Sequence, residues 1–366
     1  MEQLNLLEWD YPHVADWVAT LVHKCLPDAI DSDGFTPDLR EATLAYLQRK
    51  GKCLRPTLLT LAALAAGEKC PQNLVSAMMA VECYHTATLV HDDVIDHDAL
   101  RRGAPTVHTL VARRAAQRLG RRLGAAQAGD YGVATAIVAG DVLFGQSAAL
   151  FALLSSRYPS TVVNSILWHQ AGELNPGLLA GEQLDMELEL AELEEVTPKQ
   201  VEMMMRLKTG LLLAFAARVG AALGARKPIE NAPLAEPLGA AAEAAGIAFQ
   251  IQDDILGLFG DESQLGKPIG SDLREGKRTL LMVKAWSKAT AKDRKFLMKV
   301  LGNQELSMDD LAAARAIVER TGALASCRRR ANALLKHAEH SCQAVPDAAA
   351  RNLLLEWIHT LVKRNR

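Results

Sequence analysis

Residues 85–103 read HTATLVHDDVIDHDALRRG and place four aspartates within seven positions: Asp92, Asp93, Asp96 and Asp98. Residues three or four apart lie on one face of a helix, so Asp92 and Asp96 stack with Asp93 beside them. Carboxylates this close repel one another, and a nearby cation is expected to compensate them. They also interrupt the apolar run LVHDDVID, which makes a merely solvent-exposed acidic face less plausible. The segment therefore predicts a helix that presents a cation-binding surface.

A second acidic group lies far along the chain in FQIQDDILG, where Gln250, Asp253 and Asp254 share a helix face. Two helices facing each other with these carboxylates inward would form a strongly negative cavity. Such oxygen ligands suit Mg²⁺, which keeps several waters and is completed by substrate phosphates. Basic residues next to glycine, proline or an acidic motif would bind the phosphates: Lys52, Arg55, Arg101, Arg102, Lys208, Lys267 and Lys277.

The rest of the chain is helical in pattern. Apolar residues recur at three- and four-residue spacing along almost all 366 positions, and no strand of useful length is apparent. Segments 72–98, 132–155 and 198–225 read as long helices, and a Thr-Pro start signal opens another at residue 36. We expect one all-α domain over residues 1–366, with residues 1–35 as an N-terminal helical extension.

Composition excludes several classes of protein. The net charge of −2 lacks the basic surplus of a nucleic-acid binder. The longest uninterrupted apolar run is shorter than the ~20 residues that a membrane span needs, and the first residues do not resemble a signal peptide. Six scattered cysteines without a CxxC pair indicate free thiols in a reducing compartment. A cytoplasmic protein without a transmembrane segment is predicted.

The motifs together resemble the trans-type (E-type) isoprenyl diphosphate synthases, or polyprenyl synthetases, over about residues 36–290. GKCLRP resembles the family's GGKRLRP, with Cys53 and Lys50 in place of a usual Arg and Gly. HDDVID followed by RRG resembles its first aspartate-rich motif. GEQLDMELE, LKTG, FQIQDD and GKPIGSDLREGKRT match later family motifs in order.

The resemblance implies a bundle of long helices around a deep central cavity, of the isoprenoid synthase type and usually a homodimer. It implies condensation of isopentenyl diphosphate with an allylic diphosphate, giving a trans-prenyl diphosphate one unit longer. The allylic diphosphate ionises first, and preplaced metals and cationic side chains are a strong way to stabilise the leaving group. An apolar cavity would shield the carbocation from water.

The resemblance also assigns roles to single residues. It makes Asp92, Asp93 and Asp96 ligands of the Mg²⁺ ions on the allylic diphosphate, and Asp253 and Asp254 ligands of a further Mg²⁺ on the opposite wall, three ions in all. Family contacts to the allylic diphosphate match Arg101, Lys208 and Lys267. Contacts to isopentenyl diphosphate match Lys52, Arg55, His85 and Arg102. Lys277 belongs to the GKRT motif and would also bind substrate. Thr209 and Gln250 would flank the cation. A histidine on an apolar helix is by default a core residue, and only the family match makes His85 a ligand.

One position departs from the family pattern: Gly257 in DDILG stands where a third aspartate often lies. Either two carboxylates and water complete that metal site, or Asp261 reaches back to it; we favour the first.

Product length should depend on the side chains below the first aspartates. Ala87 and Thr88, five and four residues before Asp92, are small, so a fifteen-carbon stop is not expected. Tyr84 would lie about 12 Å along the helix, a floor for about four isoprene units. We therefore expect a C20 product, most like geranylgeranyl diphosphate synthases. A C25 or longer product is the alternative if Tyr84 packs elsewhere.

Two other readings remain open. A class I terpene cyclase shares the fold and one DDxxD motif, but it would carry a different second metal motif. A non-catalytic regulatory subunit would be expected to have lost metal ligands or basic residues, and this sequence keeps nearly all of them.

Overall fold

The computed structural model describes residues 5–122, 124–260 and 269–362. The chain forms two compact units: unit 1 is Met1–Trp168 with Arg218–Ala235, and unit 2 is His169–Ala217 with Glu236–Arg366. The chain passes from one unit to the other at three places, one of them within helix α10 (Leu211–Ala225). That residues 1–366 form one folding domain stays a prediction.

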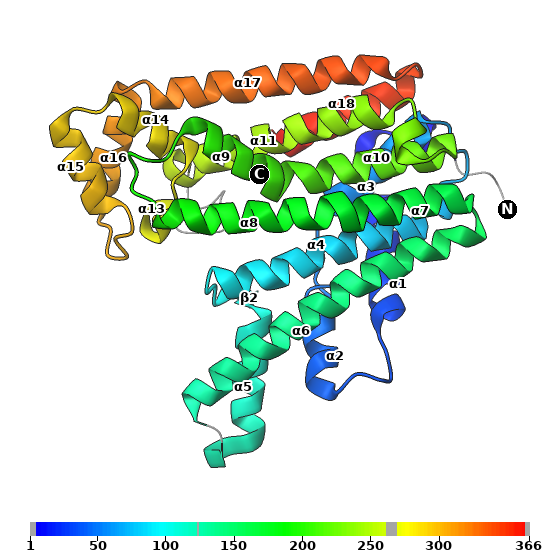
Figure 1. Cartoon of the computed structure of the whole chain (residues 1–366), viewed down its shortest axis with the longest axis horizontal. Helices are drawn as coiled ribbons and strands as arrows, with labels where there is room; N and C mark the ends of the chain where they lie inside the picture. The colour runs from blue at the N-terminus through cyan, green and yellow to red at the C-terminus, as the bar shows by residue number, and fades with distance from the viewer. Residues whose placement is uncertain (1–4, 123, 261–268, 363–366) are drawn as a thin grey trace. The chain divides into compact units, whose positions relative to one another are not determined.

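Unit 1 is built from helices and one very short strand pair (Figure 1). Its elements are η1 (Leu6–Glu8), α1 (Tyr11–Ile30), α2 (Pro37–Leu44), α3 (Leu54–Ala65), η2 (Pro71–Leu74), α4 (Val75–Ile95), β1 (Leu100–Arg101), β2 (Ala104–Pro105), α5 (Val107–Leu119), η3 (Gly120–Arg122), α6 (Ala125–Ala152), η4 (Leu153–Ser156), α7 (Ser160–His169) and η7 (Ile229–Asn231). Thr36 caps α2 by accepting a hydrogen bond from the Leu39 N–H, and Pro37 follows it, as the Thr-Pro signal predicted.

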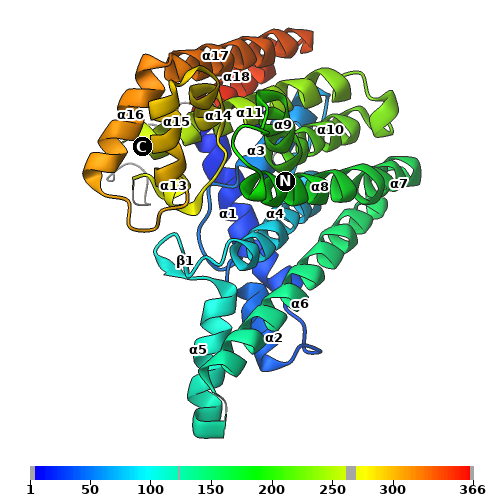
Figure 2. The ribbon, with the colours of Figure 1, turned by 60° about the vertical axis from the view of Figure 1, so that its left-hand side comes forward.

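Helix α4 carries the first aspartates and packs along α6, while α5 also lies against α6 (Figures 1 and 2). Small residues permit this close approach. A Cβ at Gly140 of α6 would lie 2.1 Å from the His91 ring of α4, and one at Gly132 would lie 2.3 Å from the His108 carbonyl of α5. Helix α4 ends at Ile95 with Asp96 as its C-cap residue, and His97 then adopts a left-handed conformation. The acidic motif therefore sits on the last turn of a buried helix.

The sequence predicted no strand, but a two-residue antiparallel ladder follows the aspartates. Leu100 pairs with Pro105 and Arg101 with Ala104. Arg102 and Gly103 form the turn with φ values of 54° and 75°, a region that glycine adopts most easily. The hairpin is too short for a hydrophobic alternation pattern to reveal it, yet it fixes the backbone of Arg101.

The described part of unit 2 contains helices joined by turns and loops, and no strand. Its elements are η5 (Gln170–Leu174), α8 (Asn175–Leu190), α9 (Pro198–Met205), η6 (Arg206–Gly210), α11 (Ala235–Phe259), α13 (Ser271–Glu275), α14 (Leu280–Lys288), α15 (Ala291–Val300), α16 (Met308–Arg320), α17 (Ala323–Ser341), η8 (Cys342–Ala344) and α18 (Ala348–Val362). Both η5 and η6 are single π-helical turns, a feature often found at functional sites.

Glycines let the π-helical turn η6 approach its neighbours. A Cβ at Gly181 of α8 would lie 2.6 Å from the backbone nitrogen of Lys208. A Cβ at Gly246 of α11 would lie 3.1 Å from the Cα of Gly210. Helices α8 and α11 of unit 2 are thereby held close to the backbone that carries Lys208.

Two helices, Ala125–Ser156 and Pro198–Ala225, are long and apolar enough to cross a membrane by length and composition alone. The core helices of globular proteins pass the same test. Of the apolar window in the second helix, 67% is buried within the fold, whereas in the first 39% is buried.

Candidate active site

The first two aspartates share one guanidinium. Arg101 Nε donates to Asp93 Oδ1 at 2.6 Å, and its Nη2 donates to Asp92 Oδ2 at 3.4 Å. Asp93 is fully buried, and its second oxygen accepts a hydrogen bond from the Tyr46 hydroxyl. Burial raises the pKa of Asp93, while Arg101 and Tyr46 act in the opposite direction. Arg101 therefore lies directly against the acidic motif.

A pocket of about 370 Å³ opens beside these residues in unit 1. Its lining combines cations with one carboxyl group: Tyr46, Arg49, Gly51, Glu82, Thr86, Leu89, Arg101 and Arg102. Sequence reasoning missed Glu82, although a glutamate in the apolar run MMAVECYHTA was a usable signal. Burial raises the pKa of Glu82, and the charges of Arg55, His23 and Arg102 partly offset this.

His85 is held neutral in the same region. Its pKa lies well below the ordinary value, first because of burial and then because Arg55, Arg102 and Arg101 repel a further positive charge. Its Nδ1 atom is buried and has no hydrogen-bond partner within the described part of the chain. A neutral imidazole among guanidinium groups fits a ligand for an anionic substrate better than an ordinary core histidine.

The loop of the GKCLRP motif is anchored by the N-terminal extension. His23 of α1 lies 2.9 Å from the Gly51 carbonyl oxygen and 3.0 Å from its amide nitrogen. Cys53 adopts a left-handed conformation with φ 44°, and its buried Sγ lies 3.6 Å from His23 Nε2. Lys52, which lies between Gly51 and Cys53 in the chain, is exposed. Helix α1 thus helps to shape this loop.

Unit 2 places Lys208 between two carboxylates that the sequence did not single out. Its Nζ donates to Asp185 Oδ2 at 2.7 Å and to Glu182 at 3.1 Å, both from the GEQLD stretch of α8. Next to it, Thr209 Oγ1 lies 3.4 Å from Gln250 Oε1. Gln250 in turn donates to Asp254 Oδ1 at 3.1 Å. The structure thus joins Lys208, Thr209 and the second acidic motif through neighbouring residues of one unit.

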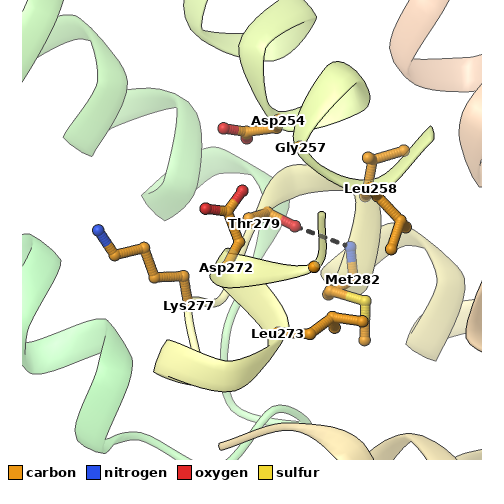
Figure 3. A pocket seen from close by; sticks show the side chains of 10 residues that line it. Asp254, Gly257, Leu258, Asp272, Leu273, Lys277, Thr279 and Met282 are labelled. Carbon is orange, nitrogen blue, oxygen red and sulfur yellow. Dashed lines mark hydrogen bonds between the residues drawn. The ribbon is translucent and has the colours of Figure 1, made fainter. Parts of the chain in front are cut away.

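A third carboxylate accompanies the second acidic pair. Asp272 of α13 lies beside Gly257, where an added Cβ would come within 3.0 Å of its Oδ2 atom (Figure 3). Asp254, Asp272 and Lys277 all line a pocket of about 250 Å³. The pKa of Asp254 is raised well above its usual value by burial, then by Asp272 and Asp253, while Gln250 and Lys277 lower it.

Our expectation that two carboxylates and water complete the second metal site stays a prediction. Asp272 is brought to the space that the missing side chain leaves. Asp261, the alternative candidate, and Lys267 lie outside the described residues.

The donor set fits Mg²⁺ bound with water and phosphate rather than a closed protein cage. Within the residues that the structure describes, no three His, Cys, Asp or Glu side chains converge closely enough to hold a metal ion by themselves. Magnesium usually takes one or two carboxylates and completes its shell with water and substrate oxygens. The mutual repulsion of Asp253, Asp254 and Asp272 is the kind that a bound cation relieves.

The predicted floor residues lie on α4. Tyr84 is 1% exposed and packs edge-on against Phe144 of α6, with ring centroids 4.9 Å apart. Ala87 is fully buried, and the Thr88 hydroxyl donates to the His85 carbonyl at 2.8 Å. Tyr84 is therefore a buried aromatic side chain, two turns before Asp92, that packs against a second ring; its role as the floor stays a prediction.

The chain is similar to several known proteins. A model of the polyprenyl synthetase family matches residues 36–318. A geranylfarnesyl diphosphate synthase from Aeropyrum pernix is 35% identical over 346 residues, which cover 91% of this chain and 98% of the relative. A geranylgeranyl diphosphate synthase from Saccharolobus solfataricus is 35% identical over 285 residues, covering 77% and 76%.

A solved structure is also similar over nearly its whole length. It is a geranylgeranyl pyrophosphate synthase from Corynebacterium glutamicum complexed with isoprenyl diphosphate and magnesium, 27% identical, with a TM-score of 0.80 and coverage of 99% of this chain and 100% of that one. The predicted all-α fold of the isoprenoid synthase type is confirmed. The chain belongs to the polyprenyl synthetase family.

Proposed function

We propose that this protein is an isoprenyl diphosphate synthase that condenses isopentenyl diphosphate head to tail with an allylic diphosphate. The observation that carries this proposal is the contact of Arg101 with both Asp92 and Asp93 beside a pocket lined by cations. Membership of the polyprenyl synthetase family supports it.

The chemistry requires cations on the leaving group. The C1–O bond of the allylic diphosphate breaks, and its electron pair departs with the diphosphate. The double bond of isopentenyl diphosphate then attacks C1, and a proton passes from the new chain to the departed diphosphate. Cations placed beforehand where negative charge develops lower such a barrier most effectively. We assign this task to Arg101 in unit 1 and Lys208 in unit 2, with Lys267 as a further candidate from the sequence.

Isopentenyl diphosphate is assigned to the residues of unit 1 around the 370 Å³ pocket. Lys52, Arg55 and Arg102 would supply the positive charge. His85 would supply a hydrogen bond without a further charge, because the surrounding guanidinium groups and burial keep its imidazole neutral. In unit 2, the Thr209 and Gln250 oxygens would face the allylic cation, and Lys277 would contact a phosphate.

Magnesium is the metal that these residues suit. In unit 1, Asp92, Asp93 and Asp96 would hold it. In unit 2, Asp253 and Asp254 would hold a further ion, with Asp272 as an additional carboxylate beside Asp254. Bound Mg²⁺ supplies Lewis-acid neutralisation of the diphosphate charge. Three ions per active site is the number that the family resemblance implies.

We propose a C20 product, geranylgeranyl diphosphate. The buried ring of Tyr84, supported by Phe144, is the proposed floor, and the small side chains of Ala87 and Thr88 leave room above it. Relatives include synthases named for C20 and for C25 products, so a longer chain is the alternative.

We further propose a homodimer in the cytoplasm. Helix α6 leaves apolar side chains exposed, among them Ile137 at 44% and Val138 at 48%, and a second copy of the chain would cover them. All six cysteines are free thiols, as expected in a reducing compartment.

A product assay on the purified chain tests the proposal. The chain would receive isopentenyl diphosphate, Mg²⁺ and dimethylallyl, geranyl or farnesyl diphosphate in turn, with products identified by mass. We expect a C20 product that disappears with chelator or in Asp92→Ala. Cyclised hydrocarbon would instead favour a terpene cyclase, and no turnover with any primer would favour a regulatory subunit.

A further inference from the structure

Tyr46 lies immediately behind the first acidic motif. It follows the C-terminus of α2, is 8% exposed, and donates its hydroxyl hydrogen to Asp93 Oδ2. The other oxygen of Asp93 accepts from Arg101 Nε at 2.6 Å. One buried carboxylate is therefore fixed from two sides, by a phenol and by the guanidinium proposed to hold the substrate.

A second connection runs from Tyr46 to the same arginine. The guanidinium of Arg49 stacks on the Tyr46 ring, 4.8 Å from its centroid, and donates to the Pro105 carbonyl at 2.8 Å. Pro105 belongs to β2, which pairs with the strand that carries Arg101. Tyr46 thus supports Arg101 in two ways: through Asp93, which binds the Arg101 side chain, and through the β1–β2 hairpin, which carries the Arg101 backbone.

The physical consequence is a loss of freedom for Arg101. An arginine on a two-residue hairpin would otherwise sample many rotamers, and ordering a long side chain on binding has an entropic cost. A carboxylate that is itself locked by Tyr46 holds the guanidinium plane in one orientation. Preorganised cations stabilise developing charge without reorganising at the moment of reaction.

We propose that Tyr46 is a positioning residue for the allylic diphosphate: it orients Arg101 through Asp93 and through the Arg49–Pro105 contact. In this role the Tyr46 hydroxyl, which is donated to Asp93, acts on the allylic diphosphate through Arg101 and not by direct contact. This inference rests on the proposed function, because it takes Arg101 as a contact of the allylic diphosphate.

The chain offers a matched control. Tyr158 in unit 1 is also buried, donates its hydroxyl hydrogen to Glu68 Oε2 at 2.6 Å, and carries the guanidinium of Arg226 over its ring at 5.1 Å. Neither Glu68 nor Arg226 lines the 370 Å³ pocket. Tyr158→Phe therefore removes the same atom from the same kind of buried triad away from the proposed site.

The test compares Tyr46→Phe with Tyr158→Phe in the full chain. Titration calorimetry with farnesyl diphosphate and Mg²⁺, without isopentenyl diphosphate, measures allylic binding directly. We expect Tyr46→Phe to weaken it about tenfold, equivalent to about 1.4 kcal/mol, and to leave the KM for isopentenyl diphosphate within twofold. Tyr158→Phe should change neither, although both variants should lose similar thermal stability.

A double-mutant cycle with Arg101→Gln separates positioning from a general structural role. If Tyr46 acts through Arg101, Tyr46→Phe should cause no further loss of farnesyl diphosphate affinity in the Arg101→Gln background. Unchanged affinity in Tyr46→Phe, equal losses for both substrates, or failure to fold while Tyr158→Phe folds would each overturn the inference. Full turnover in Asp92→Ala would instead refute the proposed site itself.

Discussion

Gly181→Ala should be the most informative small change in unit 2. The methyl group would start 2.6 Å from the Lys208 backbone nitrogen and 2.7 Å from Leu207 Cβ, whereas ordinary contacts begin near 3.4 Å. The obstacle is backbone, which cannot rotate away as a side-chain tip can. Helix α8 and the π-helical turn η6 must therefore separate by about 0.8 Å, the difference between 3.4 and 2.6 Å.

This separation has a cost in stability and a larger one in function. Overpacking of this kind costs about 1–3 kcal/mol, against a gain of about 1 kcal/mol from replacing a helical glycine. The 2.7 Å contact from Lys208 Nζ to Asp185, lengthened by the same 0.8 Å, reaches the limit of a hydrogen bond. Misplacing a catalytic group by about 1 Å can lower the rate by about 100-fold. We therefore expect kcat/KM for the allylic diphosphate to fall about 30- to 100-fold.

Steady-state kinetics and thermal unfolding of the full chain provide the measurement. Gly129→Ala in α6 is the control, because its Cβ would meet no atom within 4 Å and should leave activity unchanged. If Gly181→Ala retained wild-type kcat/KM and stability, the close approach of α8 to η6 would not position Lys208, and the reasoning would fail.

Three further results are expected. His85→Gln should weaken the dependence of the free energy of unfolding on pH. In the wild type His85 stays neutral when folded, whereas in the unfolded chain it takes up a proton below pH 6.5. Through His85 alone, the free energy of unfolding of the wild type should therefore fall by about 1.4 kcal/mol between pH 7.5 and 5.5. Denaturant titrations at both pH values measure the free energy of unfolding. If it changed with pH by the same amount in wild type and variant, this prediction would be contradicted. Tyr84→Ala should lengthen the products, as mass analysis would show; unchanged products would remove Tyr84 as the floor. Asp272→Asn should raise the Mg²⁺ concentration for half-maximal turnover about tenfold or more, since residues that support a metal site typically contribute 10–100-fold in affinity. An unchanged magnesium dependence would exclude Asp272 from the metal site.

Much of the proposed site follows from local spacing alone. Helical spacing places Asp92 and Asp96 on one face, with Asp93 on the neighbouring face. Arg101 follows within ten residues of Asp92. The helical class is equally local, because three- and four-residue periodicity and the Thr36-Pro37 cap describe single helices. The two-residue hairpin escaped notice because it is too short to carry a strand pattern.

The sequence by itself determined the fold class and the family, because each helical pattern and each family motif consists of residues close together in the chain. Only the tertiary structure decided how these groups are held. Tyr46 reaches Asp93 across 47 positions, and Lys208 reaches Asp185 across 23. Asp272 reaches the space beside Gly257 from a separate helix. No local spacing encodes such contacts, because they arise only when helices pack and bring distant side chains within hydrogen-bonding distance.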